Sequence, residues 1–151
     1  MDLLASDVMT TTVVACVPDT PLEEVVRTLA EHGISGLPVI DVHKKVVGII
    51  SEEDLLLSDE MQAPLMKTAL YGLYLPSQSV MERMAKARGI RASDVMTKHV
   101  TTFEADTPLS VIAHTLHDKH FKRVPIVDAE MKLVGIVSRG DIIRALAKKP
   151  A

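Results

Sequence analysis

The feature that most constrains the fold is an internal repeat, in which one sequence unit occurs twice with an offset of 87 residues (Ala5 against Ala92). Four motifs keep this offset without a gap: ASDVMT at 5–10 and 92–97, DTPL at 19–22 and 106–109, Pro-x-x-Asp at 38–41 and 125–128, and Val-Gly-Ile at 47–49 and 134–136. A solenoid needs at least about three repeats. Two copies therefore indicate a pseudo-twofold pair that shares one core.

The first copy predicts an extended segment, a helix, two strands and a second helix. Thr20 is expected to be the N-cap of the first helix, with Pro21 at its first position and Glu23 completing a capping box. Gly33 is expected to end that helix. Periodicity and turn residues then give the remaining elements: extended 13–17, strands 37–40 and 46–50, and a helix capped by Ser51 that runs to residue 57.

The second copy predicts the same order, with a helix from Pro108, strands at 124–127 and 133–137, and a helix at 140–148. One helix cannot cover both faces of a sheet of two or three strands, so each unit needs its twin. The expected fold class is mixed α+β, with two pseudo-twofold-related β-α-β-β-α units packed through their sheets. The expected division is a first unit at 1–57, a linker at 58–91 and a second unit at 92–151.

The linker is too apolar for a free tether and is expected to pack on the pair or on another subunit. A helix is predicted over residues 77–87, ended by Gly89. Tyr71 and Tyr74 either anchor an interface or cover an exposed sheet edge, and the sequence leaves both readings open.

Composition excludes several classes of protein. The net charge is −3 and no basic run marks a nucleic-acid-binding face. No apolar stretch approaches the roughly 18 residues of a membrane span. The single cysteine, Cys16, cannot form an internal disulfide and is expected to be a small buried side chain in a reducing compartment. Because the first residues also lack the order of a secretion signal, the expected location is the cytoplasm.

Each copy carries the pattern Gly-h-h-Ser-x-x-Asp, with h apolar, where its last strand enters its last helix: residues 48–54 and 135–141. A serine followed three residues later by an acid is also a capping-box pattern. From the local sequence, helix capping and ligand binding therefore remain alternatives at both junctions.

Taken together, the motifs resemble those of the cystathionine-β-synthase-type (CBS) domain, which occurs in tandem as a CBS pair or Bateman module. The resemblance covers nearly the whole chain outside the linker, and it rests on the ordered, duplicated set of motifs. It implies two clefts between twin units that bind AMP, ADP or ATP, with S-adenosylmethionine also possible. It further implies a regulator of another protein, one that senses cellular energy state by conformational change and is not a catalyst.

The resemblance also assigns roles to residues of this chain. Asp54 and Asp141 would accept hydrogen bonds from the two ribose hydroxyls, and Ser51 and Ser138 would lie near the α-phosphate at a helix N-terminus. The cleft served by Asp141 would comprise Thr10, Val14, Ile34, Ser35, Lys122, Arg123, Ser138, Arg139 and Asp141. The cleft served by Asp54 would comprise Thr97, Thr101, Phe121, Lys122, Ser51 and Asp54.

The two clefts differ in charge. Glu52 and Glu53 precede Asp54, whereas Arg139 and Gly140 precede Asp141. An acid about 6 Å from a phosphate repels it by roughly 3 kcal/mol at an effective dielectric constant of about 20. We therefore expect the Asp141 cleft to bind more tightly and to prefer AMP or ADP.

His114, His117 and His120 point in different directions around one helix, so a solvated face is expected there and no metal site. No catalytic motif is present, and the chain is not expected to be an enzyme. The apolar last helices predict a homodimer. The alternatives are a ligand-free structural or protein-interaction module, and a regulatory fragment of a larger enzyme or transporter.

Overall fold

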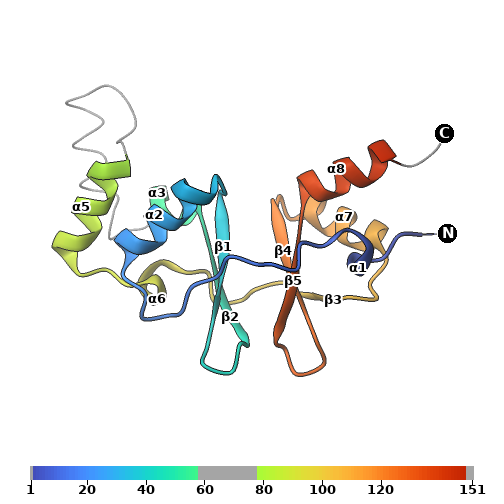
Figure 1. The fold of residues 1–151 in the computed structure, drawn as a ribbon, viewed down its shortest axis with the longest axis horizontal. Coiled ribbons are helices and arrows are strands. Elements are labelled where there is room, and N and C mark those ends of the chain that lie inside the picture. The colour runs from blue at the N-terminus through green and yellow to red at the C-terminus, as the bar shows by residue number, and fades with distance from the viewer. Residues whose placement is uncertain (1, 58–77, 149–151) are drawn as a thin grey trace. The chain divides into compact units, whose positions relative to one another are not determined.

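The computed structural model describes residues 2–57 and 78–148, which form two compact units (Figure 1). The Asp141 unit contains described residues 2–13, 43–46 and 101–148. The Asp54 unit contains described residues 14–42, 47–57 and 78–100. Tyr71 and Tyr74 lie outside the described residues.

The Asp54 unit is built on a two-stranded sheet formed by β1 (Gly36–Ile40) and β2 (Val46–Ser51). Its helices are α2 (Leu22–His32), α3 (Glu52–Leu57), α5 (Gln78–Arg88) and α6 (Ala92–Val95). Cys16 adds a parallel bridge to Val39 of β1. Leu22, Leu37 and Ile50 are fully buried in its core, and each such side chain contributes roughly 1.5–3 kcal/mol.

The Asp141 unit has a three-stranded sheet in the order β3-β4-β5. Strand β3 (Phe103–Glu104) is parallel to β4 (Arg123–Val127), and β4 is antiparallel to β5 (Leu133–Ser138), with a register shift between Ile126 and Val127. The helices of this unit are α1 (Ala5–Val8), α7 (Leu109–Asp118) and α8 (Arg139–Lys148). Ile112, Ile126 and Val137 are fully buried in its core.

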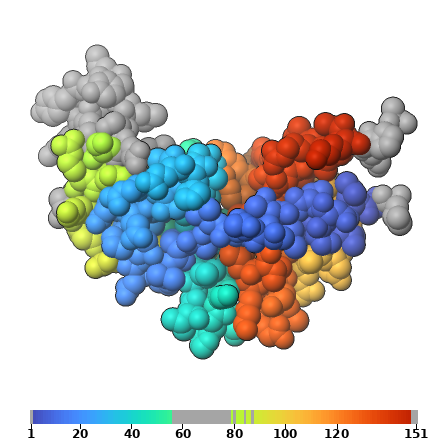
Figure 2. All heavy atoms as spheres, viewed as in Figure 1, coloured from blue at the N-terminus to red at the C-terminus, as the bar shows by residue number. Residues whose placement is uncertain are grey.

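Each ASDVMT motif, with the few residues before it, forms the opening segment of its copy. This segment packs in the core formed by the other copy. Ala5, from the first copy, is fully buried in the core of the Asp141 unit, which is otherwise made from the second copy. Ala92 and Val95, from the second copy, pack in the core of the Asp54 unit. Figure 2 shows the N-terminal residues covering second-copy elements of the Asp141 unit. The compact units therefore do not follow the division of the sequence at residues 57 and 91.

Equivalent backbone hydrogen bonds hold the two openings. In the Asp141 unit, the Ala5 N–H donates to the Thr107 carbonyl at 2.9 Å, and the Leu109 N–H donates to the Leu3 carbonyl at 2.7 Å. The same pairs recur in the Asp54 unit: Ala92 N–H to Thr20 carbonyl at 2.9 Å, and Leu22 N–H to Ile90 carbonyl at 2.9 Å. The same pair of backbone hydrogen bonds therefore holds the opening segment in each unit.

The predicted α+β class is confirmed, and the predicted helices and strands occur with ends shifted by one or two residues. The helix expected over 77–87 is α5. Two elements were not predicted, namely the short helices α1 and α6 in the ASDV segments. Four residues are too few for a helical period to show in the sequence.

The predicted N-cap of the first long helix is wrong. Pro21, not Thr20, is the residue that flanks α2, and no side-chain hydrogen bond caps this end, so Glu23 completes no capping box there. The Thr20 hydroxyl instead accepts the Val17 N–H at 3.1 Å. The Leu22 N–H, which is the first N–H of α2, already donates to the carbonyl of Ile90. Backbone from the opening segment therefore provides the acceptor that a side-chain cap would otherwise supply.

The ends of α2 and α7 provide a matched pair of positions. Gly33 follows α2 with φ 61°, and the equivalent His120 follows α7 with φ 57°. A left-handed conformation strains a side chain that has a Cβ, and glycine adopts it without that strain.

We therefore expect His120→Gly to raise the free energy of unfolding by roughly 0.5–1 kcal/mol. Chemical denaturation of the two proteins measures this difference. The matched change Gly33→Ala should lower stability, because it introduces the same strain at the end of α2. A His120→Gly variant no more stable than the parent would contradict the argument.

Candidate functional site

In the Asp54 unit, the strand-to-helix junction forms a complete capping box at the start of α3. The Ser51 N–H donates to Asp54 Oδ2 at 2.9 Å, and the Asp54 N–H donates to Ser51 Oγ at 3.4 Å. The Ser51 hydroxyl also donates to Asp54 Oδ2 at 3.2 Å. The capping alternative is therefore confirmed at this junction, and it fixes the direction of the carboxylate.

The other carboxylate oxygen of Asp54 is reached by the opening segment of the second copy. Thr97 Oγ1 donates to Asp54 Oδ1 at 3.2 Å. The backbone of Thr97 is itself fixed, since Thr97 and Ile49 exchange N–H to carbonyl hydrogen bonds at 2.9 and 3.0 Å. The exchanged opening thus brings together two residues of the predicted Asp54 cleft.

In the Asp141 unit, the equivalent junction has the same capping box at the start of α8. The Ser138 N–H donates to Asp141 Oδ2 at 2.8 Å, and the Asp141 N–H donates to Ser138 Oγ at 3.2 Å. Asp141 Oδ1 receives a hydrogen bond from the guanidinium of Arg144. Asp141 is 8% exposed and is the only polar or charged residue that is buried within the described part of the chain. A buried carboxylate needs such partners, because losing its hydration is costly.

Thr10 occupies the position in this unit that Thr97 occupies in the other. Thr10 and Ile136 exchange backbone hydrogen bonds at 2.9 and 3.0 Å, which holds Thr10 against β5 shortly before Ser138. The structure therefore places Thr10 in the same unit as the junction that contains Ser138 and Asp141, and their common role in a ligand site stays a prediction.

Arg139 connects the start of α8 to the end of α7. Its Nε donates to the Phe121 carbonyl at 2.7 Å, and its Nη2 donates to the Leu116 carbonyl at 3.0 Å. Its backbone N–H donates to the Lys122 carbonyl at 2.9 Å. These bonds give Arg139 a positioning role at the helix C-terminus, where a cation is favoured. Its predicted contact with a ligand stays a prediction.

Glycine at the start of each junction motif is required by a methionine of the exchanged opening. A Cβ on Gly48 would overlap the side chain of Met96, and a Cβ on Gly135 would overlap that of Met9. The Met-Thr ending of each opening and the glycine of each junction therefore form one packing unit. Both the Met-Thr ending and the junction glycine are repeated in the sequence. The repeat alone did not show that the methionine of one motif packs against the glycine of the other.

The structure divides the predicted residues between the two units. Six residues of the predicted Asp141 cleft lie in the Asp141 unit: Thr10, Lys122, Arg123, Ser138, Arg139 and Asp141. The other three, Val14, Ile34 and Ser35, lie in the Asp54 unit with Ser51, Asp54 and Thr97. Thr101 and Phe121 belong to the Asp141 unit. That residues of both units line common clefts stays a prediction. Sequence reasoning missed Arg144, although its spacing from Asp141 is that of a helical ion pair.

Among residues 2–57 and 78–148, no group of three or more His, Cys, Asp or Glu side chains could hold a metal ion. His114 lies 3.6 Å from Asp118 on the exposed side of α7. Burial raises the pKa of the Cys16 thiol to about 12, and Glu24 adds to the rise, so the thiol is protonated at neutral pH. No helix within residues 2–57 and 78–148 has the length and apolarity to cross a bilayer.

Comparison with known proteins gives the family. A family model described as CBS domain matches residues 5–59 and 92–148. The chain belongs to the CBS domain family. An uncharacterized protein of Methanocaldococcus jannaschii, MJ1426, is 34% identical over 160 residues, covering 95% of this chain and 91% of MJ1426. The chloroplastic CBS domain-containing protein CBSX1 of Arabidopsis thaliana is 33% identical over 133 residues. The match covers 85% of this chain but 56% of CBSX1.

Solved structures of CBS pairs share the fold. CBSX2, crystallised in complex with AMP, is 31% identical with a TM-score of 0.74, and the match covers 96% of both chains. The CBS domain pair of protein MJ0100, crystallised with 5′-methylthioadenosine and S-adenosyl-L-methionine, is 25% identical with a TM-score of 0.69. That match covers 99% of this chain and 100% of the MJ0100 chain. The tandem CBS pair expected from the sequence is confirmed.

The capping boxes generate a stability prediction. Ser51→Ala and Ser138→Ala should each lower the free energy of unfolding by about 1 kcal/mol, because each removes the oxygen that accepts a helix N–H. Chemical denaturation measures the loss, with Ser110→Ala on the exposed side of α7 as the control. If both junction variants matched Ser110→Ala in stability, the serines would have no capping role.

Proposed function

We propose that this chain is a regulatory CBS pair that binds adenosine nucleotides, with Asp54 and Asp141 accepting hydrogen bonds from the ribose hydroxyls. The single observation that carries this is the presence of the family's junction motif in both copies, with each carboxylate held in a fixed direction by its capping box. The AMP complex of CBSX2, a protein of the same fold and family, supports the ligand class.

Capping and ribose binding are compatible at one carboxylate. A carboxylate offers about four acceptor positions on its two oxygens. The capping box uses Oδ2 of each aspartate. Within residues 2–57 and 78–148, Oδ1 accepts from the Thr97 hydroxyl at Asp54 and from the Arg144 guanidinium at Asp141. A hydroxyl rotates and an exposed arginine moves, so Oδ1 remains able to accept from a sugar. The helix start supplies the positive end of its dipole to the α-phosphate.

The proposed regulation follows from differential affinity. A nucleotide that binds one arrangement of the CBS pair more tightly than another shifts the population toward that arrangement. Through this shift the chain would sense adenylate charge, that is, cellular energy state, and would modulate an unidentified partner protein without catalysing a reaction. Cytoplasmic location is part of the proposal.

A second candidate function is a ligand-free scaffold for protein interaction. It is favoured by one observation: the carboxylates of Asp54 and Asp141 already have partners on both oxygens within their own units. In this reading, the motif aspartates serve the fold alone.

Calorimetry separates the two functions. We expect wild-type protein to bind AMP, ADP or ATP, and Asp141→Ala to lose more affinity than Asp54→Ala, since Glu52 and Glu53 already disfavour phosphate near Asp54. Asp118→Ala, which removes an exposed carboxylate on α7, is the control and should bind as the parent does. If the folded parent protein gave no binding heat with AMP, ADP, ATP or S-adenosylmethionine, the nucleotide-binding function would be excluded and the ligand-free scaffold would remain. Equal losses from the two aspartate variants would defeat the predicted asymmetry.

A homodimer is also proposed. Ile143 and Leu146 lie one turn apart on α8 and are 64% and 61% exposed, although both are large and apolar. A second copy is the proposed occupant of this surface, as the family resemblance implies.

Light scattering at micromolar concentration should accordingly give the mass of two chains. Ile143→Glu should shift the population to single chains, because a charge would be buried in the contact. Ser110→Glu, on the exposed side of α7, is the matched charge control. A monomeric parent protein would overturn the proposal.

A further inference from the structure

Arg144 lies one helical turn beyond Asp141 on α8. It sits in the second turn of α8 and reaches back to the first turn, where its guanidinium pairs with Asp141. The Arg144 side chain is 68% exposed, whereas that of Asp141 is 8% exposed. Its Nη1 lies 3.3 Å from the point where a Cβ of residue 140 would stand, and Ser138 Oγ lies 3.6 Å from the same point. The guanidinium therefore lies beside the serine that starts the helix, over a position that glycine leaves open.

The charge around this helix start is opposite to what a helix alone would favour. The N-terminus of a helix carries the positive end of the dipole and favours anions. Here Asp141 is the only acidic residue in the first turn of α8. Two cationic residues belong to the first two turns of α8: Arg144, which pairs with Asp141, and Arg139, whose guanidinium donates to the carbonyls of Phe121 and Leu116. One carboxylate leaves positive charge in excess at an end that already favours a negative ligand.

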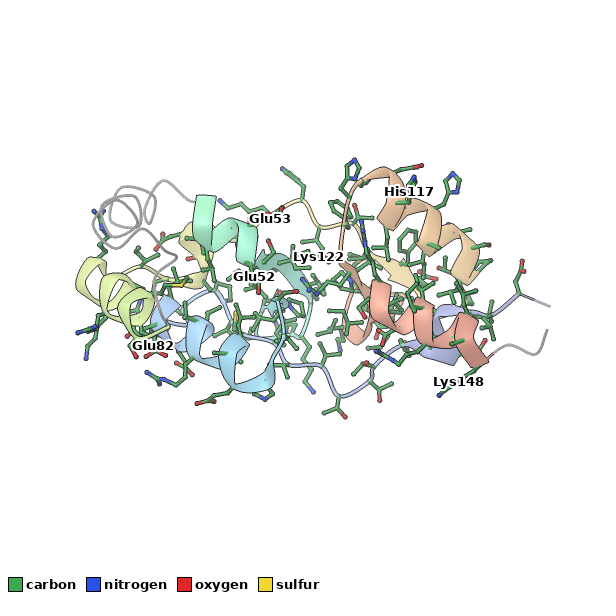
Figure 3. All side chains as sticks on the ribbon, turned by 90° about the horizontal axis from the view of Figure 1, so that it is seen from above. Glu52, Glu53, Glu82, His117, Lys122 and Lys148 are labelled. Carbon is green, nitrogen blue, oxygen red and sulfur yellow. The ribbon has the colours of Figure 1, made fainter. Side chains whose placement is uncertain are left out.

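The equivalent residues of the first copy carry no positive charge. The positions of Lys122, Arg139 and Arg144 are taken there by Ser35, Glu52 and Leu57. The first turn of α3 holds three carboxylates, and Figure 3 shows Glu52 and Glu53 projecting from it. The two junctions share a fold and a capping box, and they differ mainly in charge.

We propose that Arg144 determines the ligand-charge selectivity of the Asp141 site, which favours adenosine ligands with a 5′-phosphate over adenosine ligands without one. The proposal rests on the proposed function. Arginine has five N–H donors in a planar fork. Donors that do not bond Asp141 can bond phosphate oxygens beside Ser138, and such charge-assisted bonds are about twice as strong as neutral ones. A ligand with an uncharged 5′-group gains nothing from this cation.

The test compares two ligands that differ at the 5′-position. Calorimetry gives the Kd of AMP and of 5′-methylthioadenosine for the parent, Arg144→Gln and Arg144→Lys. We expect Arg144→Gln to weaken the binding of AMP by roughly three- to fivefold, whereas the affinity for 5′-methylthioadenosine should change by less than about twofold. Arg144→Lys should restore most of the preference, because it keeps the charge and loses only the fork. Lys148→Gln removes the same charge at the far end of α8 and should leave both affinities unchanged (Figure 3).

Each outcome decides between charge selectivity and a merely structural role. Equal loss of both ligands in Arg144→Gln would mean that the arginine only positions Asp141, and the proposal would be overturned; so would unchanged binding of AMP. If the Arg144→Gln variant does not fold, Arg144→Met, which keeps the length of the side chain and removes its charge, provides the same comparison. AMP binding should then weaken while 5′-methylthioadenosine binding stays nearly constant, and equal behaviour of the two ligands would overturn the inference. If the folded parent protein bound neither AMP nor 5′-methylthioadenosine, the proposed nucleotide-binding function itself would be wrong.

Discussion

Pairing between each opening segment and the strand of the opposite copy is the constraint on which the structure depends. Ala5 and Ala92 are completely buried, and a methionine of each opening lies where any side chain on the junction glycine would stand. Because protein interiors are close-packed, a Cβ added at either glycine would displace the methionine side chain. The same pairing brings Thr97 to Asp54 and Thr10 to β5. The packing of the core and the composition of the candidate sites thus have one origin.

The capping boxes explain why the junction residues resisted a single interpretation from sequence. A serine that accepts a helix N–H and an aspartate that accepts the serine N–H are needed to start the helix, whatever else they do. The same bonds hold each carboxylate in one orientation beside a helix N-terminus, which is a prepared position for a sugar and a phosphate. Preorganisation of this kind lowers the entropy that a ligand must lose to be bound.

The predictable part of the fold came from local signals. Apolar periodicity and Gly33 located α2, and alternation between turn residues located the four long strands within two residues. The exchange of openings has no local signal, because Ala5 carries the same neighbours in sequence whichever core it enters. The cap expected at Thr20 failed for the same reason, since the carbonyl of Ile90, distant in sequence, satisfies the helix start. Arg144 was recognisable in principle, because an acid and an arginine three apart on a helix are neighbours.

The exchanged openings also bear on how a two-copy chain of this kind is related to one with a single copy. A chain with one copy would contain an opening segment shaped for the core of another copy, and its own core would lack the corresponding alanine and methionine. Two such chains would complete each other by swapping their first residues, which is a low-cost route to a dimer. The present molecule is, in topology, such a swapped dimer made continuous by residues 58–91. Tandem duplication thereby converts an association that depends on protein concentration into one that is always intramolecular.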